Sequence, residues 1–582
     1  MKPSPAAARR SPALLCLLSL LLAGCGGGRA PDAPSPRAEA PASPAAPSGW
    51  LVGTGQALHN PEGPVCVGGG ATFCGRRVDP AVPGSIPDPL LVKATAITGP
   101  NEQTFILAST TNIGYFLAYK LEQGGPNGIF DMQRRISAET GVPPGHVVVV
   151  SDHSHNGPDT IGLWGGVEQS YLEITANAVV DAAVEAWRSR EPAQLFVSAV
   201  NDNAARLADV PPLESSYADP PAFDESRGGP SNQFRVLSAQ AADGRRILTW
   251  MNYAPHATVW NGAATDKLTG DWAAWGPQEA EALYGGMGLA ALGSLGATDW
   301  RKFGDDAAAK MAEARQRLRR LLQAAEDARE PLRGERLEVA STFIREPITQ
   351  PILLANYKPR SPTNQPGLPS ENFDVRIDRA TLPPFLLGTV FGTYISAIRI
   401  GEVFVSTFPG EPFGELEYVL RGEQRVQGAQ AYFLLGGAND FFGYMVHEDE
   451  TFQQTFEGGA LWLAGCPENA IVEPTGLDKE RACKDHWALM VSPTIGQHIV
   501  CTLQNAADTL GFATQGRGER CTALTALDGL LTPDDLPITG APGFAAAAWE
   551  QARALALQCP LTAAPAATCA ALSAAIADYA PR

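Results

Sequence analysis

Apolar and polar residues follow two different periodicities between residues 90 and 410. Short apolar runs bounded by Gly, Pro, Asn or Asp predict β-strands at residues 90–97, 104–108, 147–150, 195–200, 234–239, 246–251, 289–292, 337–343, 389–400 and 403–408. Longer stretches with helical character predict α-helices at residues 130–140, 169–187 and 305–328. Strands interleaved with helices predict a mixed α/β (α+β) fold, with mixed sheets and flanking helices.

Three local signals add detail. The four valines at 147–150 include no polar position, so they predict a strand buried on both faces, and the Asn-Gly-Pro shortly after it predicts a loop. Asp243 and Gly244 lie between two predicted strands and predict a hairpin turn. The Ala-rich residues 543–580 predict a helical tail.

The amino-terminal residues have the pattern of a bacterial lipoprotein signal. Basic residues precede an apolar run at 13–23, too short to span a bilayer, which ends in Leu-Ala-Gly-Cys. We therefore expect a signal peptide at 1–24, a lipid on Cys25 and a Pro/Ala-rich tether at 25–49. The protein is expected outside the cytoplasm, anchored by lipid to the bacterial outer membrane or cell surface.

The remaining residues divide into a large domain at 50–463 and a Cys-containing, partly helical region at 464–582. Without Cys16 in the signal and the lipid site Cys25, eight of the ten cysteines remain. Pairing of neighbours in sequence gives Cys66 with Cys74, Cys466 with Cys483, Cys501 with Cys521, and Cys559 with Cys569. Spacing alone leaves other connectivities open, but the absence of any C-x-x-C favours disulfides over a zinc cluster.

The net charge of −18 argues against a nucleic-acid partner. It also argues against electrostatic docking on an anionic membrane, so we expect the lipid anchor alone to provide membrane attachment.

The most specific candidate chemistry is the pair His153 and His155, which follows the valine strand. Eight histidines in 582 residues make a chance H-x-H uncommon. In an extended segment, side chains two residues apart point the same way, so both imidazoles could face one cavity and bind a metal. The alternative is a pair of solvated loop histidines.

Three further potential ligands lie where predicted strands run into loops. His256 follows Asn-Tyr-Ala-Pro, Glu411 ends Phe-Pro-Gly-Glu, and Tyr444 lies in Phe-Phe-Gly-Tyr-Met. Each has an ordinary alternative: a loop histidine, a strand-end cap and a packed aromatic residue. Imidazoles and a carboxylate are nevertheless ligands that suit Zn²⁺.

In order and approximate spacing, the four segments resemble those of the neutral ceramidase family over residues 50–463. The resemblance implies a zinc ion held by His153, His256, Glu411 and Tyr444, with a metal-activated water as nucleophile. It further implies catalytic roles for His155 and Tyr444, which would stabilise the oxyanion or pass a proton to the leaving amine, and places Arg206 and Asp299 at the positions of site residues.

Two features depart from the family. A family serine is replaced by Arg301, which brings bulk and positive charge where a small hydroxyl is expected. The region after residue 460 has local cysteine pairs and an Ala-rich stretch instead of the evenly spaced strands of an immunoglobulin-like domain.

The expected function is a zinc-dependent hydrolase that cleaves the carboxamide C–N bond of an N-acyl (sphingo)lipid or related amide. One alternative is a surface lipoprotein that keeps the fold and the metal for binding without catalysis. The replacement of the family serine by Arg301 is the feature that suggests it. The other is a different metallohydrolase, an esterase or phosphoesterase. The phosphoesterase pattern H-x-H-x-D-H is not present after His153.

Overall fold

The computed structural model describes residues 49–69, 74–119, 126–202, 214–215, 232–260, 266–296, 298–300, 306–347, 390–421, 426–446, 490, 492, 494–514, 519–525 and 528. The predicted signal peptide, Cys25 and nearly all of the tether lie outside these residues. So do Arg206, Arg301, Cys466, Cys483, Cys559, Cys569 and the Ala-rich tail. The domain boundaries stay predictions.

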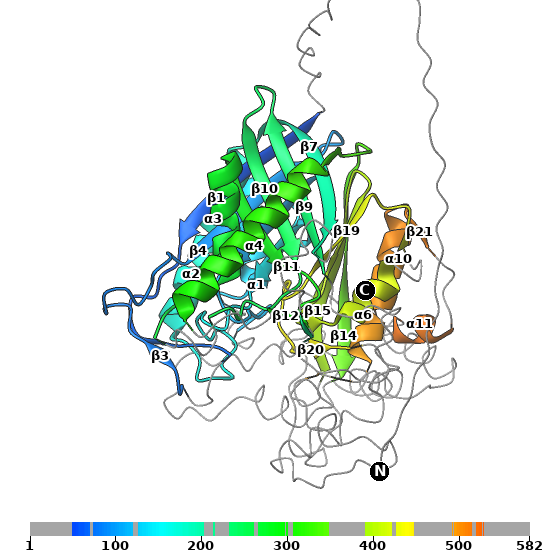
Figure 1. The fold of residues 1–582 in the computed structure, drawn as a ribbon. Helices are drawn as coiled ribbons and strands as arrows, with labels where there is room; N and C mark the ends of the chain where they lie inside the picture. Colours follow the sequence, from blue (N-terminus) through cyan, green and yellow to red (C-terminus); the bar gives the residue numbers. More distant parts are fainter. Residues whose placement is uncertain are drawn as a thin grey trace, which may run out of the picture. The chain divides into compact units, whose positions relative to one another are not determined.

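A nine-stranded sheet forms the first half of the fold (Figure 1). Its strand order is β11-β10-β9-β7-β1-β4-β5-β6, with β13 paired to β7. The pairs β5–β6 and β10–β11 are parallel and the others antiparallel, so the sheet is mixed, as predicted. The bounds are β1 Trp50–Leu58, β4 Leu91–Thr98, β5 Thr104–Thr110, β6 Val147–Ser151, β7 Glu191–Asn201, β9 Gln233–Ala241, β10 Arg246–Tyr253, β11 Met287–Leu292 and β13 Glu330–Pro331.

A second, four-stranded sheet has the order β14-β15-β16-β19. Its strands are β14 Leu337–Pro347, β15 Val390–Ile400, β16 Val403–Thr407 and β19 Ala431–Leu435. The last pair, β16–β19, is parallel. Shorter pieces are β2 Val65–Cys66, β3 Arg77–Val78, η2 Pro144–His146, β8 Glu214–Ser215, β12 Thr298–Asp299, β17 Glu411–Pro412, β18 Val426–Gln427, β20 Tyr444–Met445 and β21 Ala513–Thr514.

Helices cover the outer faces of the two sheets (Figure 1). On the nine-stranded sheet, α2 packs on β1 and β4 with α1 beside it, while α3 and α4 pack over β9–β11 and β7. On the four-stranded sheet, α10 packs on β14 and β15. The bounds are α1 Ile129–Thr140, α2 Gln169–Arg188, α3 Trp272–Tyr284, α4 Ala307–Asp327, α6 Gly414–Arg421, α10 Ile495–Thr509 and α11 Glu519–Leu524.

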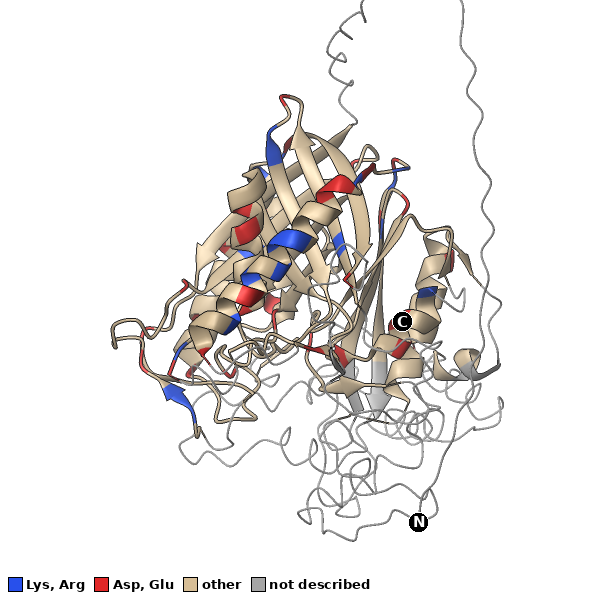
Figure 2. Ribbon diagram, viewed as in Figure 1, with Lys and Arg blue, Asp and Glu red and all other residues tan. Residues whose placement is uncertain are grey.

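The two sheets face each other across an apolar core. In β6, Val148 and Val150 join this core between the sheets, while Val147 and Val149 pack under the helices on the other face. The valine strand is therefore buried on both faces, as its composition predicts. Charged side chains lie mostly on helices and turns, and the strands are largely free of them (Figure 2).

Most predicted elements are confirmed within a few residues, including the Asp243–Gly244 turn between β9 and β10, where Gly244 has φ +86°. The two local disulfides that fall in the described residues, Cys66–Cys74 and Cys501–Cys521, are both formed. No helix in the described part of the chain is long and apolar enough to cross a membrane.

Candidate metal centre

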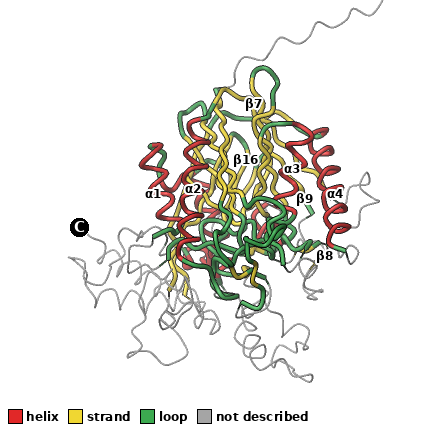
Figure 3. The backbone as a smooth tube through the Cα atoms, turned by 90° about the vertical axis from the view of Figure 1, so that its left-hand side faces the viewer, coloured by secondary structure: helices red, strands yellow, loops and turns green. Residues whose placement is uncertain are grey.

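Loops gather at one end of the strands, where β8 lies (Figure 3). Since β8 pairs with β12, and the backbone N–H of His256 donates to Thr298 of β12, the His256 loop belongs to this end. Two of the parallel strands, β6 and β10, run directly into the loops that carry His153 and His256. A parallel pair brings the carboxyl ends of its strands to one edge, where the loops that follow can meet.

The loop after β6 holds His153 in an uncommon conformation. Its φ is +48°, in the left-handed region that residues with side chains seldom occupy. The buried carboxylate of Asp152 supports the turn, because its Oδ1 accepts the backbone N–H groups of Asn112 and Ser154, both at 3.1 Å. The backbone rotation brings the imidazole of His153 into the protein interior, where it is 3% exposed.

Glu411 reaches the centre from the end of the four-stranded sheet. It forms the two-residue strand β17 after β16, in parallel register with β20, so that Glu411 lies opposite Tyr444. Its backbone N–H donates to Gly443 at 2.8 Å. This pairing places the two predicted ligands on neighbouring strands, and both side chains are buried.

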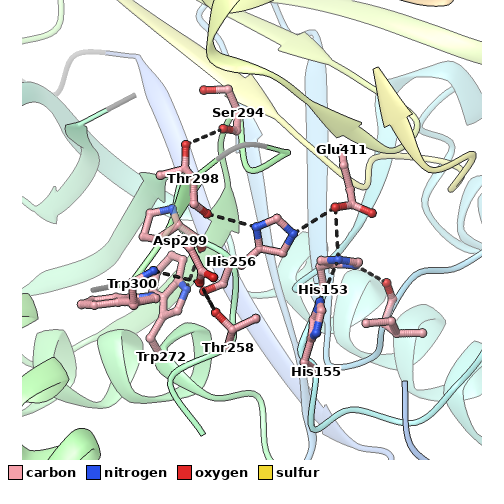
Figure 4. A network of polar contacts seen from close by, with 12 residues as sticks. His153, His155, His256, Thr258, Trp272, Ser294, Thr298, Asp299, Trp300 and Glu411 are labelled. Atoms are coloured by element: carbon pink, nitrogen blue, oxygen red, sulfur yellow. Dashed lines mark hydrogen bonds and ion pairs between the residues drawn. The ribbon is translucent and has the colours of Figure 1, made fainter. Parts of the chain in front are cut away.

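Four side-chain atoms converge at the centre (Figure 4). His153 Nε2 lies 3.5 Å from Glu411 Oε2 and 3.3 Å from His155 Nε2, and His256 Nε2 lies 3.0 Å from Glu411 Oε2. The three histidines alone form a group whose ligand atoms lie within 4.8 Å of one another. Ligands about 2.0–2.1 Å from a tetrahedral zinc ion are about 3.3–3.4 Å apart, so these spacings fit such a metal ion.

Backbone carbonyls orient two of the imidazoles. The Nδ1–H of His153 donates to Ile113 at 2.5 Å, and that of His256 donates to Thr298 at 3.0 Å. A proton on Nδ1 leaves the Nε2 lone pair free for a metal, which is the usual way proteins fix the tautomer of a ligating histidine. This donor set can hold a divalent metal ion.

The electrostatics of the centre rest on one carboxylate among histidines. Burial alone raises the pKa of Glu411, but its contacts with His153 and His256 hold that pKa well below the ordinary value. Burial alone lowers the pKa of His256, yet the hydrogen bond and charge of Glu411 raise that pKa to about 9. Burial and the two neighbouring histidines lower the pKa of His155 well below its ordinary value. Glu411 is therefore an anion facing a site that favours positive charge.

His155 lies closer to the centre than the resemblance implies, since its Nε2 is one of the converging atoms. Asp299 lies behind His256: it accepts a hydrogen bond from Thr258 and one from the backbone N–H of Trp300 at 2.9 Å. This position makes Asp299 a support of the His256 loop. Arg206 lies outside the described residues, and its role stays a prediction.

Sequence reasoning missed two residues that contact His155. Gly69, at φ +66°, lies so close that a Cβ added there would be 2.2 Å from His155 Nδ1. Arg76 donates from Nη1 to the carbonyl of His155 at 2.8 Å. Both belong to the hairpin 65–78, in which β2 pairs with β3 and Cys66 joins Cys74. Only the local cysteine pair marks this hairpin in the sequence.

No protein-family model and no curated protein matches the sequence of this chain. The solved structures that match its fold include two ceramidases. A neutral ceramidase from Pseudomonas aeruginosa superposes with a TM-score of 0.57 and 15% identity, over 79% of this chain and 74% of that one. A ceramidase complexed with C2 gives the same score and identity, over 81% and 76%. The resemblance read from the sequence is thus confirmed as similarity of fold, at low identity.

Proposed function

We propose that this protein is a zinc-dependent amide hydrolase that cleaves an N-acyl lipid or related amide. One observation carries the proposal: His153 Nε2, His256 Nε2 and Glu411 Oε2, brought together from both sheets, have the spacing of zinc ligands. The fold shared with neutral ceramidases supports an amide as the substrate class. Tyr444 would be the fourth ligand, as the resemblance implies, so that Nε2 of His155 stays available for proton transfer.

A bound zinc ion supplies Lewis acidity and lowers the pKa of water toward about 7. The residues of the chain supply position and proton transfer. Hydrolysis joins a water oxygen to the acyl carbon and breaks the C–N bond, and the leaving nitrogen takes up a proton. We assign that proton to His155, whose Nε2 faces the centre, and we assign stabilisation of the acyl oxygen to Tyr444, which lies opposite Glu411.

The proposal includes export and attachment by a lipid on Cys25. The signal pattern and the two local disulfides support it, because disulfides persist in oxidising compartments. Metabolic labelling with radioactive palmitate checks it: wild type should incorporate label and Cys25→Ser should not. Equal labelling of both would remove Cys25 as the lipid site.

The main test combines metal analysis with activity. Purified wild type should contain about one zinc per chain and release fatty acid from at least one member of a panel of N-acyl amides. His153→Ala, His256→Ala and Glu411→Ala should each lose zinc and lower kcat/KM at least about 100-fold, as expected for loss of a metal ligand.

His146→Gln is the matched control, because His146 also donates to a backbone carbonyl, that of Thr104 at 3.0 Å, but lies outside the histidine group. It should keep zinc and activity. Stoichiometric zinc without turnover of any amide or ester would favour the binding lipoprotein instead. Two metals per chain with phosphoesterase activity would favour the other metallohydrolase.

A further inference from the structure

Arg76 is half-buried beside the candidate metal centre, and its guanidinium has most of its donors unused. Nη1 donates to the backbone carbonyl of His155 at 2.8 Å. Nε and Nη2 are both shielded from solvent and have no hydrogen-bond partner among the described residues. Arg76 also forms no ion pair with any residue that the structure describes.

A buried cation without a counterion is costly, because its hydration is lost and nothing replaces it. Burial accordingly lowers the pKa of Arg76, and no neighbouring carboxylate opposes this effect. Two carboxylates of the neighbouring loops are engaged elsewhere. Glu411 contacts His153 and His256, while Asp159 accepts three backbone N–H groups from residues 162, 164 and 166 at 2.7–2.9 Å.

Backbone hydrogen bonds and a disulfide hold the described parts of the hairpin 65–78 that flank Arg76. The backbone of Val67 donates to the carbonyl of Arg76 at 3.0 Å, and Gly68 donates to Gly157 at 3.0 Å. Asp159 donates to the carbonyl of Cys66 at 2.9 Å, and the Cys66–Cys74 disulfide closes the hairpin. The guanidinium is therefore held against the loop that carries His155, which leaves its planar fork preorganised for an anion.

We propose that Arg76 binds a carboxylate of the substrate, close to the scissile amide. This inference rests on the proposed function and narrows it: the preferred substrate is an amide that carries an anionic group on its acyl or amine side. An arginine fork pairs with a carboxylate through two parallel hydrogen bonds, which would satisfy the two unused donors. A neutral N-acyl lipid would leave them unsatisfied.

Matched substrates test the proposal with the zinc-loaded protein. N-lauroylglycine carries the carboxylate on the amine side, N-dodecylsuccinamate carries it on the acyl side, and N-lauroylglycinamide is a neutral counterpart. Wild type should prefer one anionic amide over the neutral one. Arg76→Gln should lower kcat/KM for that amide about 10- to 100-fold, the range for a lost hydrogen bond to a charged group, and leave the neutral amide within about threefold.

Arg77→Gln is the control, since Arg77 is the exposed neighbour in the same hairpin. It should leave kcat/KM unchanged for both the anionic and the neutral amide. Arg76→Lys should restore part of the preference, because it keeps the charge without the fork. An equal loss for anionic and neutral amides in Arg76→Gln would show a purely structural role and overturn the proposal. A wild type that prefers the neutral amide would overturn it as well.

A binding measurement separates this inference from the proposed function. N-dodecylsulfonylglycine is a sulfonamide and offers no acyl carbon for hydrolysis. It should bind wild type at least about tenfold more tightly than Arg76→Gln by calorimetry. If no amide is hydrolysed, the proposed function fails, while this difference in affinity still supports an anion site at Arg76. Equal affinities of wild type and Arg76→Gln for this sulfonamide and, with zinc removed, for N-dodecylsuccinamate would reject the anion site whether or not hydrolysis is found.

Discussion

The imidazoles of His153 and His256 are oriented by backbone carbonyls, not by side-chain carboxylates. Their orientation therefore depends on the path of the loops around Ile113 and Thr298, and no single side-chain substitution removes either acceptor. Residues that shape those loops are therefore expected to influence metal binding as well.

Gly69 provides the sharpest test of this dependence. Because a Cβ there would overlap the imidazole of His155, Gly69→Ala should displace that ring and lower zinc affinity and kcat/KM about 10- to 100-fold. Gly84 also has a positive φ, +77°, but a Cβ added there would have no other atom within 4 Å. Gly84→Ala should therefore lower the free energy of unfolding measured in urea and leave zinc affinity and kcat/KM unchanged. Similar zinc affinities for the two variants would contradict the contact.

The carboxylate of Asp271 makes stability depend on pH. Burial raises its pKa to about 7, although the backbone N–H groups of Val259, Trp260 and Trp272 act in the opposite direction. An unfolded Asp has a pKa of about 3.9, so between about pH 4 and pH 7 the folded protein keeps a proton that the unfolded chain has released. The free energy of unfolding should therefore fall as pH rises through this window.

Asp271→Asn removes that titration. The difference in unfolding free energy between wild type and Asp271→Asn should shrink from about pH 4 to about pH 7, as urea denaturation at several pH values can measure. Asp243→Asn, at an exposed turn, should follow wild type. A wild-type advantage that grows with pH would show that the carboxylate is stabilised in its charged form.

The residues that sequence reasoning found, and those it missed, differ in their local signals. His153, His155, His256 and Glu411 follow strands, and their segments have a recognisable order, so they could be predicted together. Gly69 and Arg76 lie in a short hairpin whose apolar and polar residues show little periodicity. Arg76 contacts His155 across 79 residues of sequence. A tertiary contact of this kind leaves no pattern in the local sequence.

At the scale of elements, the hairpin 65–78 acts as a clamp on the His155 loop. Cys66→Ser/Cys74→Ser should lower the unfolding free energy by about 2–3 kcal/mol, the value for a closed loop of this size. It should also weaken zinc binding, because Gly69 would no longer be held against the imidazole of His155. Calorimetric zinc titration measures the second effect.

The second described disulfide is the control for that experiment. Cys501–Cys521 joins α10 to α11 and belongs to a separate cluster of buried residues. Cys501→Ser/Cys521→Ser should lower stability and leave zinc affinity as in wild type. If both double variants bound zinc normally, the hairpin would have no role in shaping the centre.

The helices and strands that could not be predicted share one property: their apolar and polar residues have no clear helical or strand periodicity. The helix α3 contains Gly276, Pro277 and two tryptophans, and more than half of its residues are buried, so it lacks the clear amphipathic spacing of α4. The strand β1 starts within a Gly- and Pro-rich context, and α10 is buried on most sides. Tertiary packing, rather than local propensity, determines these elements.

At the scale of the whole molecule, the candidate ligands come from both sheets. His153 and His256 follow strands of the nine-stranded sheet, and Glu411 follows the four-stranded one. A metal ion bound by all three therefore links the two layers. Zinc at 100 times its dissociation constant should raise the unfolding free energy by about 2.7 kcal/mol, and removal by a chelator should reverse this.

Thermal unfolding with and without chelator measures this linkage. Glu411→Gln, which removes the carboxylate ligand that follows the four-stranded sheet, should show a much smaller shift. The control His146→Gln should show the full shift. A stabilisation by zinc that is equal in wild type and Glu411→Gln would place the metal elsewhere.

Because the ligands come from both sheets, the order of sheet packing and metal binding during refolding is constrained. His256 and Glu411 are 155 residues apart, and closing so long a loop is slow and entropically unfavourable before other contacts form. The coordination sphere can exist only after the two layers have docked. Metal capture would thus be a late event in refolding, and the rate at which cobalt(II) acquires its absorption in the native centre would report how quickly the chain completes its sheet packing.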